Sequence, residues 1–68
     1  MYYLIDPMSK VLLDKNKELV RLFEQLDRYT KQARPIVITD ETGEVRAGNS
    51  RGWPYVDQTV KPERYQLS

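Results

Sequence analysis

Three carboxylates gather around one expected turn, and they are the residues best placed for chemistry in this sequence. Asp40, Glu41 and Glu44 all lie within "TDETGEV". Carboxylate oxygens are the ligands that Ca²⁺ and Mg²⁺ prefer in proteins. The spacing does not match the twelve-residue calcium loop, and an aspartate also commonly begins a type I turn. We therefore interpret the three side chains as turn-forming and solvated, and we expect no metal and no cofactor.

Acid–base and nucleophilic catalysis have few other candidates. The chain of 68 residues contains no cysteine and no histidine, so it lacks the commonest transition-metal ligand and the usual proton shuttle. A serine nucleophile would need a lysine or a carboxylate as its base, and Ser9, Ser50 and Ser68 all lie in turn-like or terminal sequence. The glycines do not form a phosphate-binding loop. The sequence therefore predicts a protein without catalytic activity.

The side chains best suited to binding another protein lie in "NSRGWPYV", residues 49–56. Arg51, Trp53 and Tyr55 belong to the residue types that most often dominate binding energy at interfaces. We predict a partner-binding site made of these three residues and Arg46. The alternative is that Trp53 folds over the sheet and completes a small core. The sequence leaves both interpretations of Trp53 open.

The overall charge gives no strong attraction to nucleic acid. The chain has 11 lysine and arginine residues and 10 aspartate and glutamate residues, a formal net charge of +1. Basic and aromatic residues nevertheless alternate toward the C-terminus, and such an arrangement can stack bases and contact phosphates. A small DNA- or RNA-binding regulator or antitoxin is therefore the alternative to a protein-binding module.

One amphipathic helix is the clearest element, predicted from Lys17 to Ala33. Apolar residues recur there at steps of three and four, which is typical of a helix with one buried stripe. We expect the stripe to pack on a sheet, with Val20 or Tyr29 left exposed as a small contact for a homodimer. The stripe comprises Leu19, Val20, Leu22, Phe23, Leu26, Tyr29 and Ala33.

The flanking and polar residues agree with this helix. Asp14 or Asn16 can cap its beginning, and Pro35 is expected to stop it. Opposite charges four residues apart on the polar face add support. These pairs are Glu24 with Arg28 and Asp27 with Lys31.

A hairpin is predicted directly after the helix. Residues 36–39 form a β-branched run, and Asp40 suits the first position of a turn. Gly43 can take the positive φ that closes a three-residue hairpin loop, after which residues 45–48 return.

The N-terminus carries a turn of similar outline. A shift of 34 positions (40 minus 6) places Asp6 on Asp40 and Ser9 on Gly43. Residues 2–5 and 11–13 are then the strands of another hairpin. The alternative is that Asp6 and Pro7 begin a longer helix that continues to Ala33.

Two local resemblances accompany this layout. "PIVITDETGEVRAGN", residues 35–49, resembles the opening hairpin of PAS sensor domains, in which an Asp-x-x-Gly turn is followed by a strand and an asparagine. "LVRLFEQLDRYTKQARPIVITDETGEV", residues 19–45, is similar in layout to the helix and strands of Phd/YefM-type antitoxins. Each resemblance covers only part of the chain, so neither implies the whole fold and neither transfers a site.

Together these patterns predict an α+β fold. A small antiparallel β-sheet of one or two hairpins packs on the single helix, in ββαββ or βαββ order. Residues 1–48 form the compact domain, and residues 49–68 form a segment rich in proline and aromatic residues that folds back or binds a partner. No apolar run is long enough for a membrane span, and the start does not resemble a signal peptide, so we expect a cytoplasmic location. The preferred function is docking on a larger protein to modulate or inhibit it, as inhibitors encoded by phages and mobile elements do.

Overall fold

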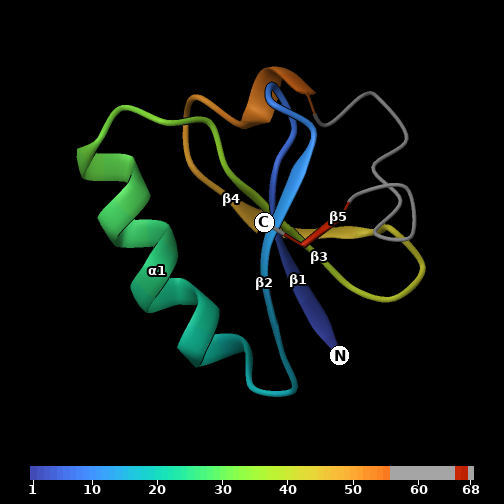
Figure 1. The fold of residues 1–68 in the computed structure, drawn as a ribbon. Helices are drawn as coiled ribbons and strands as arrows, with labels where there is room; N and C mark the ends of the chain where they lie inside the picture. The colour runs from blue at the N-terminus through green and yellow to red at the C-terminus, as the bar shows by residue number, and fades with distance from the viewer. Residues whose placement is uncertain (56–65, 68) are drawn as a thin grey trace.

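The computed structural model describes residues 1–55 and the strand residues 66–67. The described residues form one α-helix and a β-sheet, which confirms the predicted α+β fold and the ββαββ order (Figure 1). No helix among the described residues is long and apolar enough to cross a membrane. The elements are β1 (Tyr2–Asp6), β2 (Val11–Asn16), α1 (Leu19–Lys31), β3 (Val37–Thr39), β4 (Val45–Gly48), the 3₁₀ turn η1 (Trp53–Tyr55) and β5 (Gln66–Leu67).

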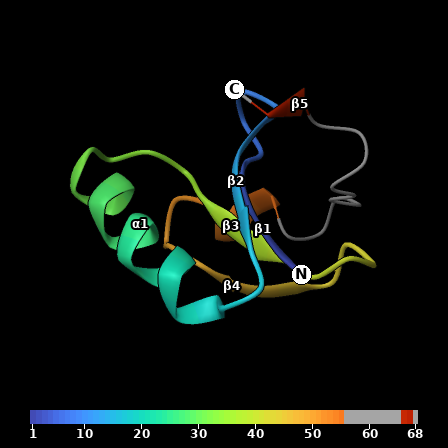
Figure 2. The same ribbon diagram turned by 60° about the horizontal axis from the view of Figure 1, so that its bottom comes forward.

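The N-terminal strand lies in the middle of the sheet, whose strand order is β4-β3-β1-β2-β5. β1 pairs antiparallel with both β2 and β3, and β3 pairs antiparallel with β4. The short β5 adds to β2 in the parallel direction. In two views the helix lies along one face of this sheet (Figures 1 and 2).

The alternation of side chains along the strands builds a buried cluster on each face of the sheet. On the helix side, Leu22 of α1 packs with Leu4, Ile36 and Ile38, and all four residues are fully buried. Ile5, Leu12 and Val37 form the cluster on the other face. Successive residues of β1 therefore serve opposite faces, as the two-residue period of a strand requires.

The helix is shorter than predicted at both ends. Glu18 occupies the N-cap position and makes no side-chain cap, so the prediction that Asp14 or Asn16 caps the helix is wrong. Asp14 belongs to β2, and Asn16 instead accepts a hydrogen bond from the backbone N–H of Glu18 at 2.8 Å. The chain thus enters the helix through a turn held by a residue two positions before the cap.

The C-terminal end of α1 stops ahead of Pro35, through a local backbone motif. Ala33 has φ 58°, its N–H bonds to the carbonyl of Thr30, and the N–H of Arg34 bonds to the carbonyl of Tyr29. This pattern is the Schellman motif, in which glycine usually occupies the left-handed position. Because alanine stands there instead, the helix end carries backbone strain.

The apolar stripe is narrower than predicted. Leu22 is buried, and Leu19, Leu26 and Tyr29 pack against the helix-side cluster. Val20 is 60 % exposed and Phe23 is 41 % exposed, so these two side chains stand at the margin of the contact with the sheet. Of the two residues proposed as a dimer contact, Val20 is therefore the exposed one.

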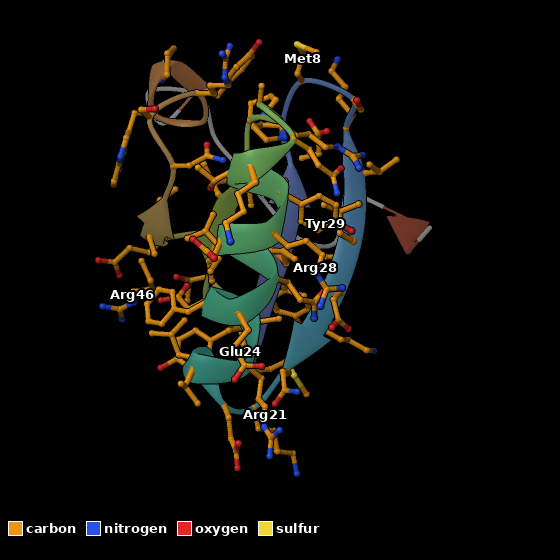
Figure 3. The ribbon with its side chains drawn as sticks, turned by 90° about the vertical axis from the view of Figure 1, so that its left-hand side faces the viewer. Met8, Arg21, Glu24, Arg28, Tyr29 and Arg46 are labelled. Atoms are coloured by element: carbon orange, nitrogen blue, oxygen red, sulfur yellow. The ribbon has the colours of Figure 1, made fainter. Side chains whose placement is uncertain are left out.

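The two predicted charge pairs of the helix differ in outcome. The Lys31 ammonium lies 3.5 Å from the Asp27 carboxylate, which confirms that pair. Among the described residues, Glu24 and Arg28 form no ion pair, and Figure 3 shows both side chains on the outer surface of the helix. Arg28 is therefore an exposed cation without a local partner in this part of the chain.

Both predicted hairpins are present, and the alternative of a helix from Pro7 to Ala33 is wrong. In the second hairpin Gly43 has φ 88° and its N–H bonds to the carbonyl of Asp40 at 3.1 Å, as predicted. In the first hairpin the left-handed residue is Lys10, with φ 60°, and not Ser9. The reason is loop length: Asp6 pairs with Val11, so the first loop is one residue longer than the second.

Candidate functional site

The buried side chain of Asn49 joins three separate segments directly after β4. Its Oδ1 accepts the backbone N–H groups of Ile36, at 3.0 Å, and Gly52, at 2.8 Å. Its Nδ2 donates to the carbonyl of Arg34, at 2.6 Å, and to the Thr30 hydroxyl, at 3.2 Å. One amide therefore holds together the end of α1, the start of β3 and the loop that follows β4.

Gly52 lets this loop lie directly on the backbone before β3. A Cβ atom at Gly52 would stand 2.2 Å from the carbonyl oxygen of Ile36, which no side chain can accommodate. The N–H groups of Gly52 and Trp53 both bond to the carbonyl of Asn49, at 3.0 and 3.1 Å. This close approach determines where η1 begins.

The turn between β1 and β2 is held by Asp6, whose side chain is only 1 % exposed. Its Oδ1 accepts the backbone N–H groups of Met8 and Ser9, both at 3.0 Å, and its Oδ2 accepts Nε of Arg34 at 2.6 Å. Burial raises the pKa of Asp6, but the Ser9 N–H and the Arg34 guanidinium together outweigh it and hold the pKa below the ordinary value. The guanidinium also lies over the Tyr29 ring, 5.2 Å from its centroid.

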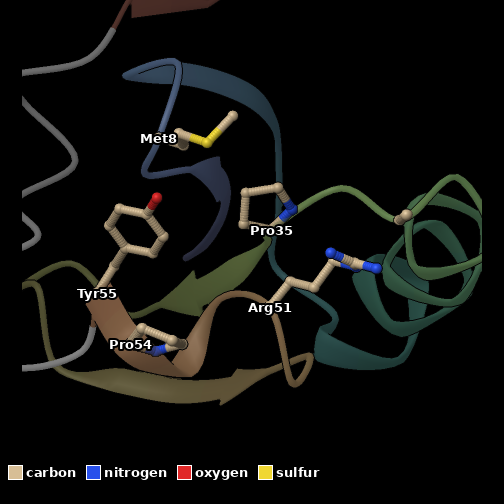
Figure 4. Close-up of a pocket in the computed structure, with 6 residues that line it drawn as sticks. Met8, Pro35, Arg51, Pro54 and Tyr55 are labelled. Atoms are coloured by element: carbon tan, nitrogen blue, oxygen red, sulfur yellow. The ribbon is translucent and has the colours of Figure 1, made fainter.

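Asn49 and Asp6 hold segments that border an open hollow of about 420 Å³, which we call the Met8–Tyr55 hollow (Figure 4). It lies between the β1–β2 turn, the segment after α1 and the loop that leads into η1. Figure 4 shows Met8 and Tyr55 together on one side of the hollow, with Pro35 facing them and the Arg51 side chain extended toward α1. The lining consists of Met8, Ala33, Pro35, Arg51, Pro54 and Tyr55.

The structure brings together two of the four residues predicted to bind a partner. Arg51 and Tyr55 line the hollow. Trp53 lies between them in the chain and is 50 % exposed, so it does not serve as a closed lid on the core. Arg46 lies elsewhere: its guanidinium is 3.2 Å from Asp40, and Figure 3 shows it far from Met8.

Sequence reasoning missed Asn49, Met8 and the two prolines of the hollow. One signal could have identified Asn49, because Asn49-x-x-Gly52 repeats the spacing of Asp40-x-x-Gly43. In both cases a side-chain oxygen can accept backbone N–H groups a few residues ahead. No comparable local pattern marks Met8, because the contact of its turn with Arg34 arises only in the folded chain.

The carboxylates of the 40–44 turn serve that turn. Asp40 Oδ1 accepts the hydroxyl of Thr42 at 2.6 Å and the backbone N–H groups of Thr42 and Glu44 at 2.9 and 3.1 Å. The hydroxyl bond is the main reason that the pKa of Asp40 lies below its usual value. Within residues 1–55 and 66–67, no cluster of three or more side chains has the composition and placement of a metal site.

Comparison of the chain with family models, curated proteins and solved structures gives no match. The resemblances of residues 35–49 and 19–45 therefore rest on those residues alone, and the functional argument depends on the geometry of the hollow.

Proposed function

We propose that this protein is a cytoplasmic, non-enzymatic binding module that docks on a larger protein through the Met8–Tyr55 hollow and modulates or inhibits it. The observation that carries the proposal is the composition of this surface. An arginine, a tyrosine, a methionine and two prolines line one hollow, and Trp53 stands half exposed in the same loop. Arginine, tryptophan and tyrosine are the residue types enriched among interface positions that dominate binding energy.

The frame of the hollow supports this proposal because it is held in place before any partner arrives. Asn49 and Gly52 hold the loop to β3, and Asp6 holds the turn that carries Met8. Ordering loops and side chains on association is unfavourable, and a frame already ordered avoids part of that loss. Rigid aromatic groups on such a frame are typical of a docking surface.

The alternative, a nucleic-acid-binding regulator, has less support in the arrangement of charge. Arg46 belongs to the alternating basic and aromatic pattern. Its guanidinium lies 3.2 Å from the Asp40 carboxylate and 3.7 Å from the Glu44 carboxylate. Its charge is therefore largely balanced within its own hairpin. We retain nucleic-acid binding as an outcome that the experiment must distinguish.

The test is affinity capture with three forms of the chain from two portions of one lysate, of which only one is treated with nuclease. These are the wild type, the Arg51→Ala, Tyr55→Ala double variant, and Arg28→Ala as a control for an exposed cation of α1 that does not line the hollow. We expect the wild type and the control to capture one protein that the double variant loses, with unchanged thermal unfolding. With the isolated partner, each single substitution should weaken binding by about 1–2 kcal/mol.

Two results would contradict the proposal. One is full affinity of the folded double variant for the isolated partner. The other is capture that depends on nucleic acid, seen as loss on nuclease treatment and as affinity that falls steeply with salt concentration.

A further inference from the structure

The Met8–Tyr55 hollow has a one-sided charge. Among the residues that the structure describes, the six that line it include one cation, Arg51, and no carboxylate. The rest of the lining is a thioether, two proline rings, a methyl group and a phenol ring. A ligand for this surface therefore meets apolar and aromatic contacts together with a single guanidinium.

Arg51 differs in its pairing from most of the other arginines that the structure describes. Arg21 pairs with Glu18, Arg34 with Asp6 and Arg46 with Asp40. Within the part of the chain that the structure describes, Arg51 has no carboxylate within 4.0 Å. Arg28 shares this property, but it is an exposed residue at the flank of α1 (Figure 3) and does not line the hollow.

The end of α1 does not neutralise Arg51. Its side chain extends toward that end (Figure 4), where the helix dipole is equivalent to roughly half a negative charge. Half a charge favours the orientation of a cation but leaves a net positive group at the surface. The planar guanidinium then keeps donors that match the two oxygens of a carboxylate.

The apolar part of the hollow suits an aromatic side chain. Sulfur–aromatic contacts are favourable, and aromatic rings pair with one another in offset or edge-to-face geometry. A volume of about 420 Å³ lies near the lower end of the range of ligand sites, roughly 300–1,000 Å³. It therefore suits one anchoring side chain and the residue beside it more than a large cofactor.

We infer that the Met8–Tyr55 hollow recognises an extended segment of the partner in which an aromatic residue is followed by an aspartate or glutamate. The aromatic ring packs between Met8, Pro35 and Tyr55, and the neighbouring carboxylate pairs with Arg51. This inference rests on the proposed protein-binding function and specifies the chemistry of the partner.

The test uses four blocked hexapeptides whose central pair is Phe-Glu, Phe-Gln, Ala-Glu or Phe-Lys. Acetylated and amidated ends remove terminal charges. The full chain has two methionines and one tryptophan, so the Met8 ε-methyl signal and Trp53 fluorescence each report on a single known place. Met8→Leu assigns the methyl signal, because only the Met1 signal remains.

We expect the Phe-Glu peptide to shift the Met8 methyl signal most strongly. Replacing Glu by Gln should weaken binding about three- to tenfold, and Phe-Lys should bind least. Arg51→Gln should remove the difference between the Glu and Gln peptides and leave the difference between Phe and Ala. Arg28→Gln should change nothing.

The inference is overturned if the wild type binds the Glu and Gln peptides equally, if Arg28→Gln acts like Arg51→Gln, or if no peptide shifts the Met8 signal up to its solubility limit. The proposed function can stand independently of these results. If a protein partner is captured through Arg51 and Tyr55 but peptide charge has no effect on binding, only the proposed chemistry of the partner segment is refuted. Charge-selective peptide binding without a captured protein refutes the docking function.

Discussion

The two aspartate-led turns of this chain use one local device in two settings. In each turn, Oδ1 of the aspartate accepts backbone N–H groups of the residues that follow, and Oδ2 accepts Nε of an arginine. Asp6 reaches Arg34, 28 positions away, and its side chain is 1 % exposed. Asp40 reaches Arg46, six positions away in the same hairpin, and its side chain is 18 % exposed.

The difference lies in what each aspartate connects. The Asp40 bonds close one loop, which begins and ends within its own hairpin. The Asp6 bonds join the β1–β2 turn to the segment after α1, and both of these border the Met8–Tyr55 hollow. The same hydrogen bonds therefore fix only the loop shape in the Asp40 hairpin, whereas in the Asp6 hairpin they also fix the position of the turn relative to the rest of the fold.

The largest expected effect is the loss of the Asp6 carboxylate. Asp6→Ala removes a buried carboxylate and leaves the partly buried N–H groups of the turn and the Arg34 guanidinium without their acceptor, so we expect a loss of about 3 kcal/mol in the free energy of unfolding. Asp40→Ala is the matched control and should lose less, because water reaches that turn. Urea unfolding measures both, and equal losses would show that burial does not distinguish the two turns.

The two hairpins also differ in how far the sequence predicts them. The second hairpin could be predicted because the aspartate, the glycine and the β-branched strand are all local signals. The first was ambiguous between hairpin and helix, since Asp6 and Pro7 suit either. Its register depends on a bulge between Leu4 and Ile5 and on Arg34, neither of which can be read from the turn itself.

The sequence predicts the candidate site only in part, because tertiary contacts decide which residues line it. Residue type predicts Arg51 and Tyr55, which line the hollow, whereas closeness in sequence is a poor guide for Arg46, which does not line it. In the fold Arg46 turns back to the acidic loop of its own hairpin. Met8 enters the hollow from the other hairpin, and composition alone gives no sign of that.

The next effect concerns the positive φ of the second turn. Gly43→Val should lower the free energy of unfolding by about 1–2 kcal/mol, because a β-branched residue is strained at φ 88°. Thr42→Val, at the neighbouring position, serves as a control for added β-branched bulk, although it also removes the hydroxyl bond to Asp40. Thermal unfolding of the variants measures the loss, and an unchanged melting temperature for Gly43→Val would show that the loop accepts another backbone geometry.

The pH dependence of stability should separate the two turns more finely. The pKa of Asp6 in the folded chain lies below its ordinary value of 3.8, which it takes when the chain unfolds. The unfolded state then binds more protons, so this stabilisation is fully present above about pH 3.8 and disappears as pH falls through the lower, folded pKa. Asp40 contributes with the same sign.

The measurement is the melting temperature between pH 6 and pH 2 for the wild type, Asp6→Asn and Asp40→Asn. We expect Asp6→Asn to remove more of the acid-induced loss than Asp40→Asn does. If the three curves run parallel, the ion pair of Asp6 with Arg34 does not govern acid stability, and the comparison of the two turns fails on this point.

The smallest expected effect is a gain, from giving the first turn the residue that the second already has. Lys10 holds φ 60° without being glycine, and the strain of a left-handed L-residue is roughly 1–2 kcal/mol. Glycine also gains entropy in the unfolded chain, which offsets about 0.5–1 kcal/mol of that relief. Lys10→Gly should therefore raise the free energy of unfolding by about 0.5–1 kcal/mol. Ser9→Gly, which changes the residue that aligns with Gly43 in sequence, should lower it. Paired urea unfolding curves decide the matter: if Ser9→Gly stabilises and Lys10→Gly does not, the first loop has the geometry of the second after all.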